Sequence, residues 1–322
     1  MKAIRAAKTG GPEVMHLEEL PTPRPGEGEL LVRLEAAGVN FIDIYQRSGA
    51  YKLPLPLSLG AEGAGVVEAK GPNVGEFEVG DRVAWCGAPG SYATHVLVSA
   101  EKAVAVPAAI DSRTAAAAML QGITAHYLSR STYHLQQGDA CVIHAAAGGV
   151  GLLLTQMAKI AGAHIVGTVS TKDKAQLAKA NGADVIVLYT HDDFVAAAKK
   201  ATDGRGVQVV YDSVGQTTFD GSLRSLAPRG MLVLYGQSSG PVPPVDPQRL
   251  HHGGSLYLTR PTLGHYTATR GELLTRAREL FVWIETGLVK VRIGATFPLA
   301  EAADAHRALA ARETTGKVLL IP

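Results

Sequence analysis

The spacing of hydrophobic and polar positions changes near residue 115 and divides the chain into stretches of different character. Before that point the hydrophobic runs are short and end at Gly or Pro. Residues 29–40, "ELLVRLEAAGVN", alternate apolar and polar positions, and residues 63–71 and 80–87 form two further short runs. Short strands with this punctuation are typical of an antiparallel or barrel-like unit, so we predict a β-rich first unit that ends near Leu120.

A second pattern begins with a helix predicted over residues 112–131, for which Ser112 is the expected N-cap. Continuous apolar runs then alternate with amphipathic helical segments. The run "DACVIHAA" (139–146) precedes a helix from Gly149, and "VQVVYDSVG" (207–215) belongs to the same series. Buried β-branched runs that alternate with helices indicate an α/β unit with a parallel sheet covered on both faces.

The end of the chain returns to a mixed pattern. Pro228 and Gly230 are expected to end the last helix of the alternating series, before the apolar strand "GMLVLYG". Residues 270–287 then predict a long helix, which strand, helix and strand follow. One helix and two strands bury too little surface to fold alone, so we expect this tail to rejoin the first unit. The predicted domains are 1–121 together with 263–322, and 122–262 inserted between them.

Composition and charge narrow the function classes. The 322 residues include 31 basic and 29 acidic side chains, with no block of like charge, so we expect neither a nucleic-acid partner nor a membrane partner. The two cysteines, Cys86 and Cys141, cannot form a disulfide framework or a four-thiolate zinc site. A reducing, cytoplasmic setting is the simplest interpretation. The start of the chain has no apolar signal-peptide region, and no apolar run is long enough to predict a membrane span.

A glycine-rich link joins the first strand of the alternating region to its first helix. The link Ala146–Gly151 fits the dinucleotide fingerprint G-x-G-x-x-G, with Ala146 in place of the first glycine. Gly148 would let a pyrophosphate approach the backbone, Gly151 would let the helix pack on the strand, and the helix N-terminus would supply free N–H groups. A tight turn that binds no ligand remains the alternative.

The second strand of the series indicates which dinucleotide is bound. Sites for NAD place a carboxylate at this strand end to hold the ribose 2′-hydroxyl. Here the strand ends "GTVSTKDK", and no acidic residue comes before Asp173. The hydroxyl of Ser170 and the ammonium of Lys174 would bind a 2′-phosphate, so NADPH is favoured over NADH. The alternative roles are an N-cap for Ser170 and a solvated position on the helix for Lys174.

Four motifs together resemble one known family: "HAAAGGVGLLLTQMAK", "YDSVG", "AAGVNFIDIYQRSGAY" and "GAEGAG". The chain resembles, over its whole length, the NADPH:quinone oxidoreductases, which are zinc-independent members of the medium-chain dehydrogenase/reductase superfamily related to zeta-crystallin. The resemblance implies a GroES-like catalytic domain and a Rossmann doubly wound domain, with the cofactor in the cleft between them. It also implies a homodimer formed by pairing of Rossmann edge strands, a role that would suit "GMLVLYG".

The zinc-dependent relatives differ at two positions. They place a cysteine ligand soon after the strand that here ends "AAGVNFID", and His-Glu where this chain has Ala61 and Glu62. Asn40 and Ala61 stand at the two ligand positions, and neither completes a tetrahedral zinc site. Without a metal to polarise an alcohol, we expect quinone reduction by hydride transfer rather than alcohol oxidation.

The resemblance also implies site residues. Those expected to be catalytic are Asn40, which would orient the carboxamide or a quinone oxygen, Tyr45, and Tyr51, which would line the substrate cleft. A loop residue that caps its own backbone remains the alternative for Asn40, and a surface turn for Tyr51. The residues expected to contact the cofactor are Phe41, Asp43, Tyr127, Gly148, Gly149, Val150, Gly151, Ser170, Lys174, Tyr189, Ser213, Gly236, Gln237, Ser238, Ser239, Leu263 and Arg312.

Two other functions stay open. Reduction of an activated carbon–carbon double bond in enones or alkenals needs the same cofactor geometry, so the sequence does not separate it from quinone reduction. Binding of AU-rich RNA, gated by the nucleotide, is implied by zeta-crystallin relatives. The near-neutral charge and the lack of an aromatic and basic surface pattern argue against that function.

Overall fold

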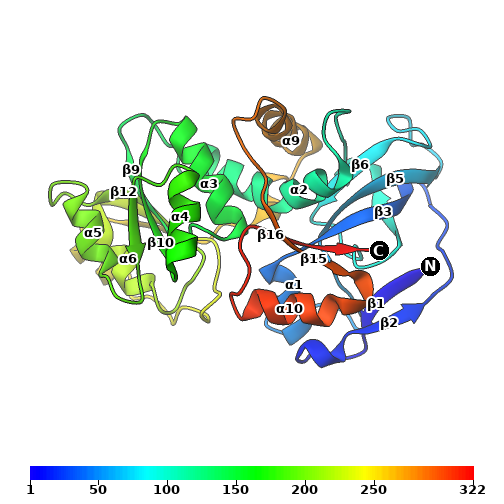
Figure 1. Ribbon diagram of the computed structural model, residues 1–322, viewed down its shortest axis with the longest axis horizontal. Coiled ribbons are helices and arrows are strands. Elements are labelled where there is room, and N and C mark those ends of the chain that lie inside the picture. Colours follow the sequence, from blue (N-terminus) through cyan, green and yellow to red (C-terminus); the bar gives the residue numbers. More distant parts are fainter. The chain divides into compact units, whose positions relative to one another are not determined.

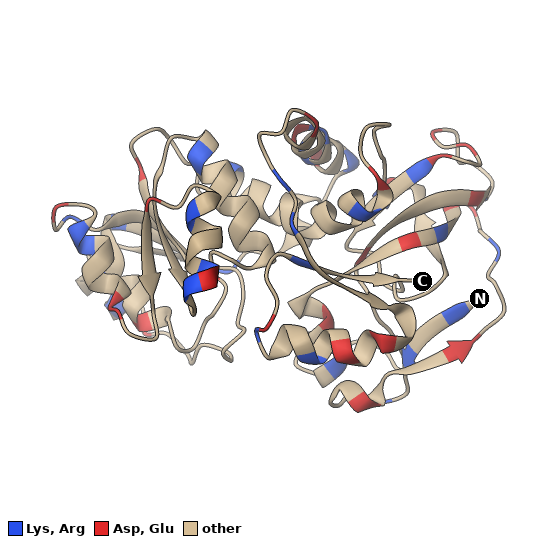
Figure 2. Ribbon diagram, in the orientation of Figure 1, with Lys and Arg blue, Asp and Glu red and all other residues tan.

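The computed structural model describes all 322 residues, which form two compact units. Unit 1 comprises Met1–Ile123 and Thr267–Pro322, and unit 2 comprises Thr124–Tyr266. The boundaries expected from the sequence lie within helix α2 (Ser112–Tyr127) and directly before helix α8 (Leu263–Tyr266). Figure 2 shows acidic and basic residues distributed along the elements of both units.

Unit 1 is built on a seven-stranded sheet whose order is β15-β16-β3-β5-β6-β8, with β7 also paired to β3 (Figure 1). The last strand, β16, pairs antiparallel with β3, so that Val318 lies opposite Val39. The tail of the chain therefore joins the sheet of unit 1. The strands of this sheet are β3 (Glu29–Val39), β5 (Glu62–Lys70), β6 (Arg82–Cys86), β7 (His95–Ser99), β8 (Ala103–Ala105), β15 (Ile293–Pro298) and β16 (Lys317–Ile321).

A smaller sheet and four main helices complete unit 1. The small sheet has the order β2-β1-β4. Its strands and the helices are β1 (Lys2–Ala6), β2 (His16–Glu19), β4 (Leu57–Ser58), α1 (Phe41–Ser48), α2, α9 (Arg270–Glu285) and α10 (Ala302–Ala310). The core of unit 1 includes Trp85 and Tyr92, both almost fully buried.

The start of α2 differs from the prediction. Ser112 is the first residue of the helix, and the cap is provided by Asp111, whose carboxylate accepts a hydrogen bond from Thr114 N at 2.7 Å. A carboxylate suits this position because it also interacts favourably with the positive end of the helix dipole. The assignment of Ser112 as N-cap was therefore wrong by one residue.

Unit 2 contains a six-stranded sheet in the order β11-β10-β9-β12-β13-β14, and every neighbouring pair is parallel. The chain starts at the central strand β9, builds outward to β11, and then continues from β12 on the other side. This is the doubly wound Rossmann arrangement, and its switch point lies between β9 and β12. The strands are β9 (Ala140–Ile143), β10 (His164–Val169), β11 (Val185–Leu188), β12 (Val207–Asp212), β13 (Leu226–Leu234) and β14 (Tyr257–Thr259).

Helices connect successive strands of unit 2, as the alternating pattern predicted. They are α3 (Gly149–Ile160), α4 (Lys172–Ala180), α5 (Phe194–Lys200) and α6 (Phe219–Ser225), with the short α7 (Gln248–His252) before β14. Val142, Val210 and Leu232 come from three neighbouring strands and are fully buried in the core of this unit. The mixed α/β fold class predicted from the sequence is confirmed.

Two details of β13 correct the sequence interpretation. Helix α6 ends at Ser225, and β13 begins at Leu226, so Pro228 lies within the strand rather than at the end of the helix. The register between β12 and β13 shifts between Val207 and Val209, which accommodates Pro228 as an irregularity. The segment "GMLVLYG" is also not an edge strand, because β14 pairs with it on the outer side.

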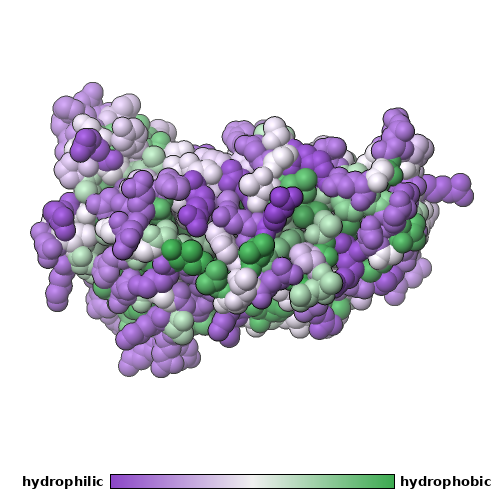
Figure 3. Space-filling view, turned by 90° about the horizontal axis from the view of Figure 1, so that it is seen from above, coloured by the Kyte–Doolittle hydropathy of each residue, from purple (hydrophilic) through white to green (hydrophobic).

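The surface seen in Figure 3 is mostly hydrophilic, with apolar residues exposed in small groups. Among the large apolar side chains that are exposed, Leu55, Val79 and Tyr257 belong to different parts of the chain. No helix is both long enough and apolar enough to cross a membrane.

Candidate cofactor and active site

The residues of the predicted glycine motif lie at the carboxyl end of β9, in the link between this strand and α3. The link after β9 contains Ala145 at a positive φ of 51°, and Gly148 is the N-cap of α3. A Cβ atom on Gly151 would lie 2.2 Å from the carbonyl oxygen of Ala145, so only glycine fits there. The helix therefore starts in close contact with the turn that follows the strand. Its first N–H groups lie at the topological switch point, where open α/β sheets bind their ligands.

The residues predicted to bind a 2′-phosphate lie at the ends of two adjacent strands. Ser170 follows β10 and Tyr189 follows β11, and these strands pair so that Val169 lies opposite Leu188. Lys174 lies in the first turn of α4. The hydroxyl of Thr171, rather than of Ser170, caps this helix by accepting a hydrogen bond from Lys174 N at 3.3 Å. The alternative role of Ser170 as N-cap is therefore wrong.

A buried carboxylate organises the loop after β12. Asp212 Oδ1 accepts hydrogen bonds from the backbone N–H groups of Val214 at 2.8 Å and Gly215 at 2.9 Å. Asp212 Oδ2 accepts one from Ser222, whose Oγ also lies 3.0 Å from His144 Nε2. Burial lowers the pKa of His144, so it is a neutral core histidine, as its position on the first strand suggested. This network holds Ser213, a predicted cofactor residue, at the end of its strand.

The loops after β12 and β13 are joined to each other. Ser239 Oγ donates to the carbonyl of Val214 at 2.7 Å and accepts from Thr217 N at 3.1 Å. A Cβ atom on Gly236 would lie 2.5 Å from the carbonyl oxygen of Ser213. The side chain of Ser239 therefore holds the two loops together, which is a different role from the cofactor contact predicted for it. Gln237 and Ser238 lie in the same joined pair of loops.

Aromatic residues gather along α1 of unit 1. The ring of Tyr45 lies 6.1 Å from that of Phe41 and 5.3 Å from that of Tyr51, measured between centroids. All three side chains are half-buried. The structure therefore brings together three residues that the resemblance assigned to the nicotinamide and substrate region, and it gives them one shared apolar surface.

Asp43, although it belongs to the same helix, has a different environment. It is fully buried, and its Oδ2 accepts hydrogen bonds from Asn40 N at 2.8 Å and from Tyr92 Oη at 3.0 Å. Burial raises the pKa of Asp43 to about 7, partly opposed by these hydrogen bonds. The predicted cofactor contact of Asp43 is therefore replaced by an internal role at the start of α1.

A chain of hydrogen bonds continues from Asp43 through the core of unit 1. Tyr92 Oη lies 3.0 Å from His306 Nε2, and Arg47 Nη1 donates to His306 Nδ1 at 3.1 Å. Arginine can only donate, so Nδ1 accepts and the ring proton is on Nε2. Burial and the neighbouring Arg47 lower the pKa of His306 to about 3, so this histidine is neutral. We call these four residues the Asp43–Arg47 chain.

Asn40 lies beside a buried ion pair. The ammonium of Lys317 binds the carboxylate of Glu62, and both side chains are almost completely buried. Asn40 Oδ1 accepts from Lys317 Nζ at 2.8 Å, and Asn40 Nδ2 donates to Glu62 Oε2 at 2.9 Å. Glu62 Oε1 accepts from Leu120 N at 2.6 Å, and Gln121 Nε2 donates to Asn40 Oδ1 at 3.4 Å. We call Asn40, Glu62, Lys317 and Gln121 the Lys317 cluster.

The contacts of Asn40 change its expected role. Its Nδ2 also donates to the carbonyl of Gly38 at 3.3 Å, so both amide hydrogens and both oxygen lone pairs are used within the unit. Only 4% of its surface is exposed. A direct hydrogen bond from Asn40 to carboxamide or quinone therefore has no free group to form it. The alternative, an internal loop role, agrees better with these contacts.

The Lys317 cluster does not suit a metal ion. No three His, Cys, Asp or Glu side chains lie close enough together to hold one. Ala61 offers no donor atom, and the oxygens of Asn40 and Glu62 already bind an ammonium that would repel a cation. Zinc requires several sulfur, imidazole or carboxylate ligands, which these residues cannot supply.

The remaining predicted residues are more scattered. Tyr127 is buried and stacks on Tyr266 with 4.2 Å between ring centroids, so within unit 2 it is a packed residue of the helix core. Leu263 begins α8, and Arg312 is an exposed residue at a positive φ of 60° after α10.

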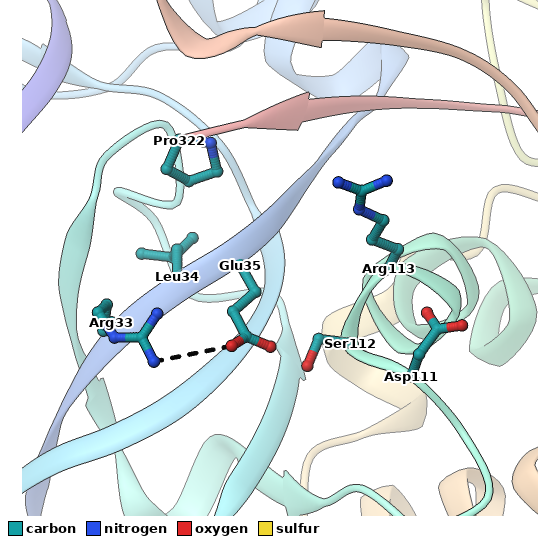
Figure 4. Close-up of a pocket in the computed structure, with 7 residues that line it drawn as sticks. All are labelled: Arg33, Leu34, Glu35, Asp111, Ser112, Arg113 and Pro322. Carbon is teal, nitrogen blue, oxygen red and sulfur yellow. Dashed lines mark ion pairs between the residues drawn. The ribbon is translucent and has the colours of Figure 1, made fainter.

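A separate pocket lies on unit 1, away from the predicted residues (Figure 4). Its lining combines Arg33 and Glu35 of β3, which form an ion pair of 3.7 Å, with the start of α2 and the end of β16. Charges of both signs line it, and it includes none of the candidate residues.

Sequence reasoning assigned no site role to six residues of the two unit 1 networks: Arg47, Glu62, Tyr92, Gln121, His306 and Lys317. Lys317 had a readable signal, because it is a charged residue directly before the apolar run "VLLI" of a predicted strand. The others are ordinary members of helical or strand patterns. Only their tertiary partners distinguish them.

Comparisons with known proteins agree with this geometry. Residues 26–108 match the model of the alcohol dehydrogenase GroES-like domain, and residues 149–275 match that of zinc-binding dehydrogenase. With a Rossmann unit inserted into a β-rich unit, these matches define a member of the medium-chain dehydrogenase/reductase superfamily.

Full-length relatives narrow the class. A quinone oxidoreductase of Pseudomonas aeruginosa is 49% identical and a 2-haloacrylate reductase of Burkholderia is 41% identical, with at least 97% of each chain covered. The crystal structure of Escherichia coli quinone oxidoreductase complexed with NADPH is 44% identical over all of both chains, with a TM-score of 0.98. The chain belongs to the quinone oxidoreductase family of this superfamily.

Proposed function

We propose that this protein reduces quinones by hydride transfer from NADPH. The observation that supports this most directly is the end of β10, where a hydroxyl and a lysine stand and a carboxylate is missing. A 2′-phosphate is attracted by these groups and would be repelled by an acid. The NADPH complex of the related quinone oxidoreductase supports the same assignment.

Bound NADPH supplies a hydride from its nicotinamide ring, which carries two electrons to the quinone, and a proton from solvent completes the hydroquinone. In this proposal Gly148, Gly149, Val150 and Gly151 hold the pyrophosphate at the start of α3. Ser170, Lys174 and Tyr189 bind the 2′-phosphate, and Ser213 and Gly236 approach the nicotinamide ribose through their backbones.

The aromatic surface of α1 has a substrate role in the proposal. Phe41, Tyr45 and Tyr51 offer flat apolar faces, which suit a planar quinone ring. A quinone delocalises the charge that develops on its oxygens, so such a site can act chiefly by orienting the ring and excluding water.

Reduction of an activated carbon–carbon double bond is the second candidate. It is favoured by the 41% identity to a 2-haloacrylate reductase, a value close to that of the quinone oxidoreductases. The same hydride donor and the same apolar surface serve this reaction. Only the acceptor differs.

We also propose that the protein is a cytoplasmic homodimer. The two cysteines are buried and unpaired, as suits a reducing compartment. The edge strand β14 carries the exposed Tyr257, and a second copy would satisfy its open backbone groups by strand pairing. Sedimentation equilibrium of the wild-type protein and of Tyr257→Lys, which places a charge at an exposed position of this edge, tests the dimer.

A single assay separates these candidates. Oxidation of NADPH and of NADH is measured with naphthoquinone, benzoquinone, an alkenal and 2-chloroacrylate as acceptors. We expect NADPH to be preferred and quinones to give the highest kcat/KM. Lys174→Ala should reduce the preference for NADPH about 10-fold, the size of one charge-assisted contact. Equal use of NADH by the wild type, or turnover of the alkenal alone, would contradict the proposal.

A further inference from the structure

The link between α1 and β4 exposes an apolar segment to solvent. Leu53, Pro54, Leu55 and Pro56 are exposed one after another, and the two leucines expose 37% and 55% of their surface. No other stretch of the chain exposes four apolar residues in succession. Single apolar residues are normal on a protein surface, but a run of this length is typical of a surface that binds a ligand or a partner. We call residues 53–56 the leucine segment.

The backbone holds the leucine segment on the surface. Each leucine precedes a proline, which favours an extended conformation, and the proline rings fix their own φ angles. At one end Tyr51 N donates to the carbonyl of Tyr45 at 3.0 Å, and at the other end Leu57 is fully buried in β4, opposite Ala6. The segment is therefore anchored on both sides, and it loses little conformational freedom when a ligand covers it.

The leucine segment lies next to the aromatic surface of α1. Tyr51, whose ring centroid lies 5.3 Å from that of Tyr45, is separated from Leu53 by one residue. An extended chain covers at most about 7 Å over two residues. Aromatic faces and aliphatic side chains therefore follow one another within unit 1, and Lys52 is the one charged residue from Tyr51 to Pro56.

The size and the charge of the leucine segment indicate what it can bind. A stable interface with a second copy of the chain buries about 800 Å² on each partner, which four side chains cannot supply. Attachment to an anionic membrane surface uses a cluster of basic residues, whereas this link contributes only Lys52. A hydrocarbon chain needs neither a large area nor a charge, because each CH₂ group that it buries contributes separately.

We propose that Leu53 and Leu55 are specificity-determining residues that bind the hydrocarbon side chain of a quinone whose ring lies on the aromatic surface of α1. This inference rests on the proposed function and names its substrate class, which is alkyl- or prenyl-substituted quinones rather than bare rings. The ring contacts aromatic faces and the side chain contacts the two leucines, so both parts of the substrate meet neighbouring residues of unit 1.

Two quinones with the same ring test the leucine segment. Decylubiquinone carries a decyl chain, and the second compound is the same dimethoxy-methyl-benzoquinone ring without that chain. We expect the kcat/KM of the wild type to be about 10-fold higher for the decyl compound. The double variant Leu53→Ser with Leu55→Ser should lose this preference through a higher KM for the decyl compound alone. Val79→Ser, at an exposed apolar position elsewhere in unit 1, is the matched control and should change neither value.

A conservative variant separates apolar contact from a role in the fold. Leu53→Met with Leu55→Met keeps the apolar character and should retain the preference for decylubiquinone within about 3-fold. Both leucines are exposed, so we expect the thermal unfolding midpoints of the serine and methionine variants to stay close to that of the wild type. Should the double serine variant fail to fold, Leu55→Ser, at the more exposed position, gives the same comparison.

Several results would overturn the inference. One is an equal kcat/KM of the wild type for the two quinones, and another is an equal loss for both in the serine variant, which would mean that the segment acts on the fold. If the serine variant keeps the decyl preference but changes the sedimentation equilibrium, the segment binds a second copy instead. If it keeps that preference but loses binding to phosphatidylcholine vesicles, the segment binds a membrane instead.

Titration calorimetry of the two quinones without NADPH separates this inference from the proposed function. Tighter binding of decylubiquinone to the wild type than to the serine variant supports the leucine segment even when no NADPH is oxidised. Failure of the wild type to oxidise NADPH with either quinone would instead reject the proposed function. Equal binding of decylubiquinone to the wild type and the serine variant would overturn the role of the two leucines.

Discussion

The two buried hydrogen-bond networks of unit 1 meet at the start of α1. They stabilise buried titratable side chains in different ways. The Lys317 cluster keeps its charges and pairs them: both members of its ion pair are buried, and Asn40 and the backbone of Leu120 bind the remaining atoms. The Asp43–Arg47 chain has a carboxyl whose Oδ1 is buried without a partner. A single hydrogen bond, from Asn40 N to Asp43 Oδ2, connects the networks.

The difference teaches how burial is tolerated by titratable groups. In the first network a charged group is stable because its opposite is within contact distance. In the second the groups tend toward neutrality: burial raises the pKa of Asp43 to about 7 and lowers that of His306 to about 3. The stability contributed by the Lys317 cluster therefore depends on its intact ion pair. The stability contributed by the Asp43–Arg47 chain depends on pH.

The largest effect should come from breaking the ion pair. Lys317→Met leaves Glu62 as an unpaired buried carboxylate, so we expect a loss of about 3–5 kcal/mol in the free energy of unfolding. The double variant with Glu62→Gln should recover most of that loss, because no isolated charge then remains. Urea unfolding followed by circular dichroism measures both. If Lys317→Met loses less than about 1 kcal/mol in the free energy of unfolding, water must reach the Lys317–Glu62 ion pair.

A pH series distinguishes the second network from the first. The pKa of Asp43 is higher in the folded state, so its contribution is present below pH 4 and is lost as pH rises towards 7. The pKa of His306 is lower in the folded state, so its contribution is present above pH 6.5 and is lost as pH falls towards 3. Between pH 4 and 6.5 the two slopes oppose each other, and single variants should separate them.

Relative to the wild type, Asp43→Asn should make stability rise more steeply with pH over this range, and His306→Gln should make it fall with pH. Glutamine can accept from Arg47 and donate to Tyr92, so it replaces the neutral histidine with little loss of hydrogen bonding. The full span of each slope should be on the order of a few kcal/mol. Unfolding in urea at several pH values measures it, and parallel curves for all three proteins would reject the assignment.

The smallest effect concerns the hydroxyl that links the chain. Tyr92→Phe removes the hydroxyl between Asp43 and His306, so each of these residues loses one of its two buried hydrogen-bond partners. We expect a loss of about 1–3 kcal/mol in stability, measured by thermal unfolding. In Asp43→Asn with Tyr92→Phe the loss should be smaller than the sum of the single losses, because the residues share one contact. Strict additivity would show that the hydrogen bond contributes nothing.

The sequence predicted the fold better than it predicted the roles of individual side chains. Alternation of apolar runs and helices is a local signal, and it indicated the Rossmann strands. The return of the tail to unit 1 was expected for another reason, because one helix and two strands bury too little surface to fold alone. Local signals fail where two possible helix starts differ by one residue, as at Asp111 and Ser112. They also fail where strand pairing determines the element to which a residue belongs, as for Pro228 in β13.

Site roles depended on spacing within one motif or on distant partners. Gly151 was predictable because the close approach that it permits involves Ala145, only six residues away. Asn40 and Asp43 were expected beside the cofactor, and their internal roles depend on Lys317 and Tyr92, 277 and 49 residues away in the chain. No periodicity in a single sequence reports such contacts.

The position of β16 in the sheet of unit 1 has a consequence for synthesis on the ribosome. This strand lies between β15 and β3 and contributes Lys317, yet it follows every other strand of the sheet in the chain. Unit 2 is continuous from Thr124 to Tyr266, so its sheet can form before β16, the last strand of unit 1, has been synthesised. Until then β3 keeps an open edge, and that interval is when a nascent chain most needs protection from aggregation.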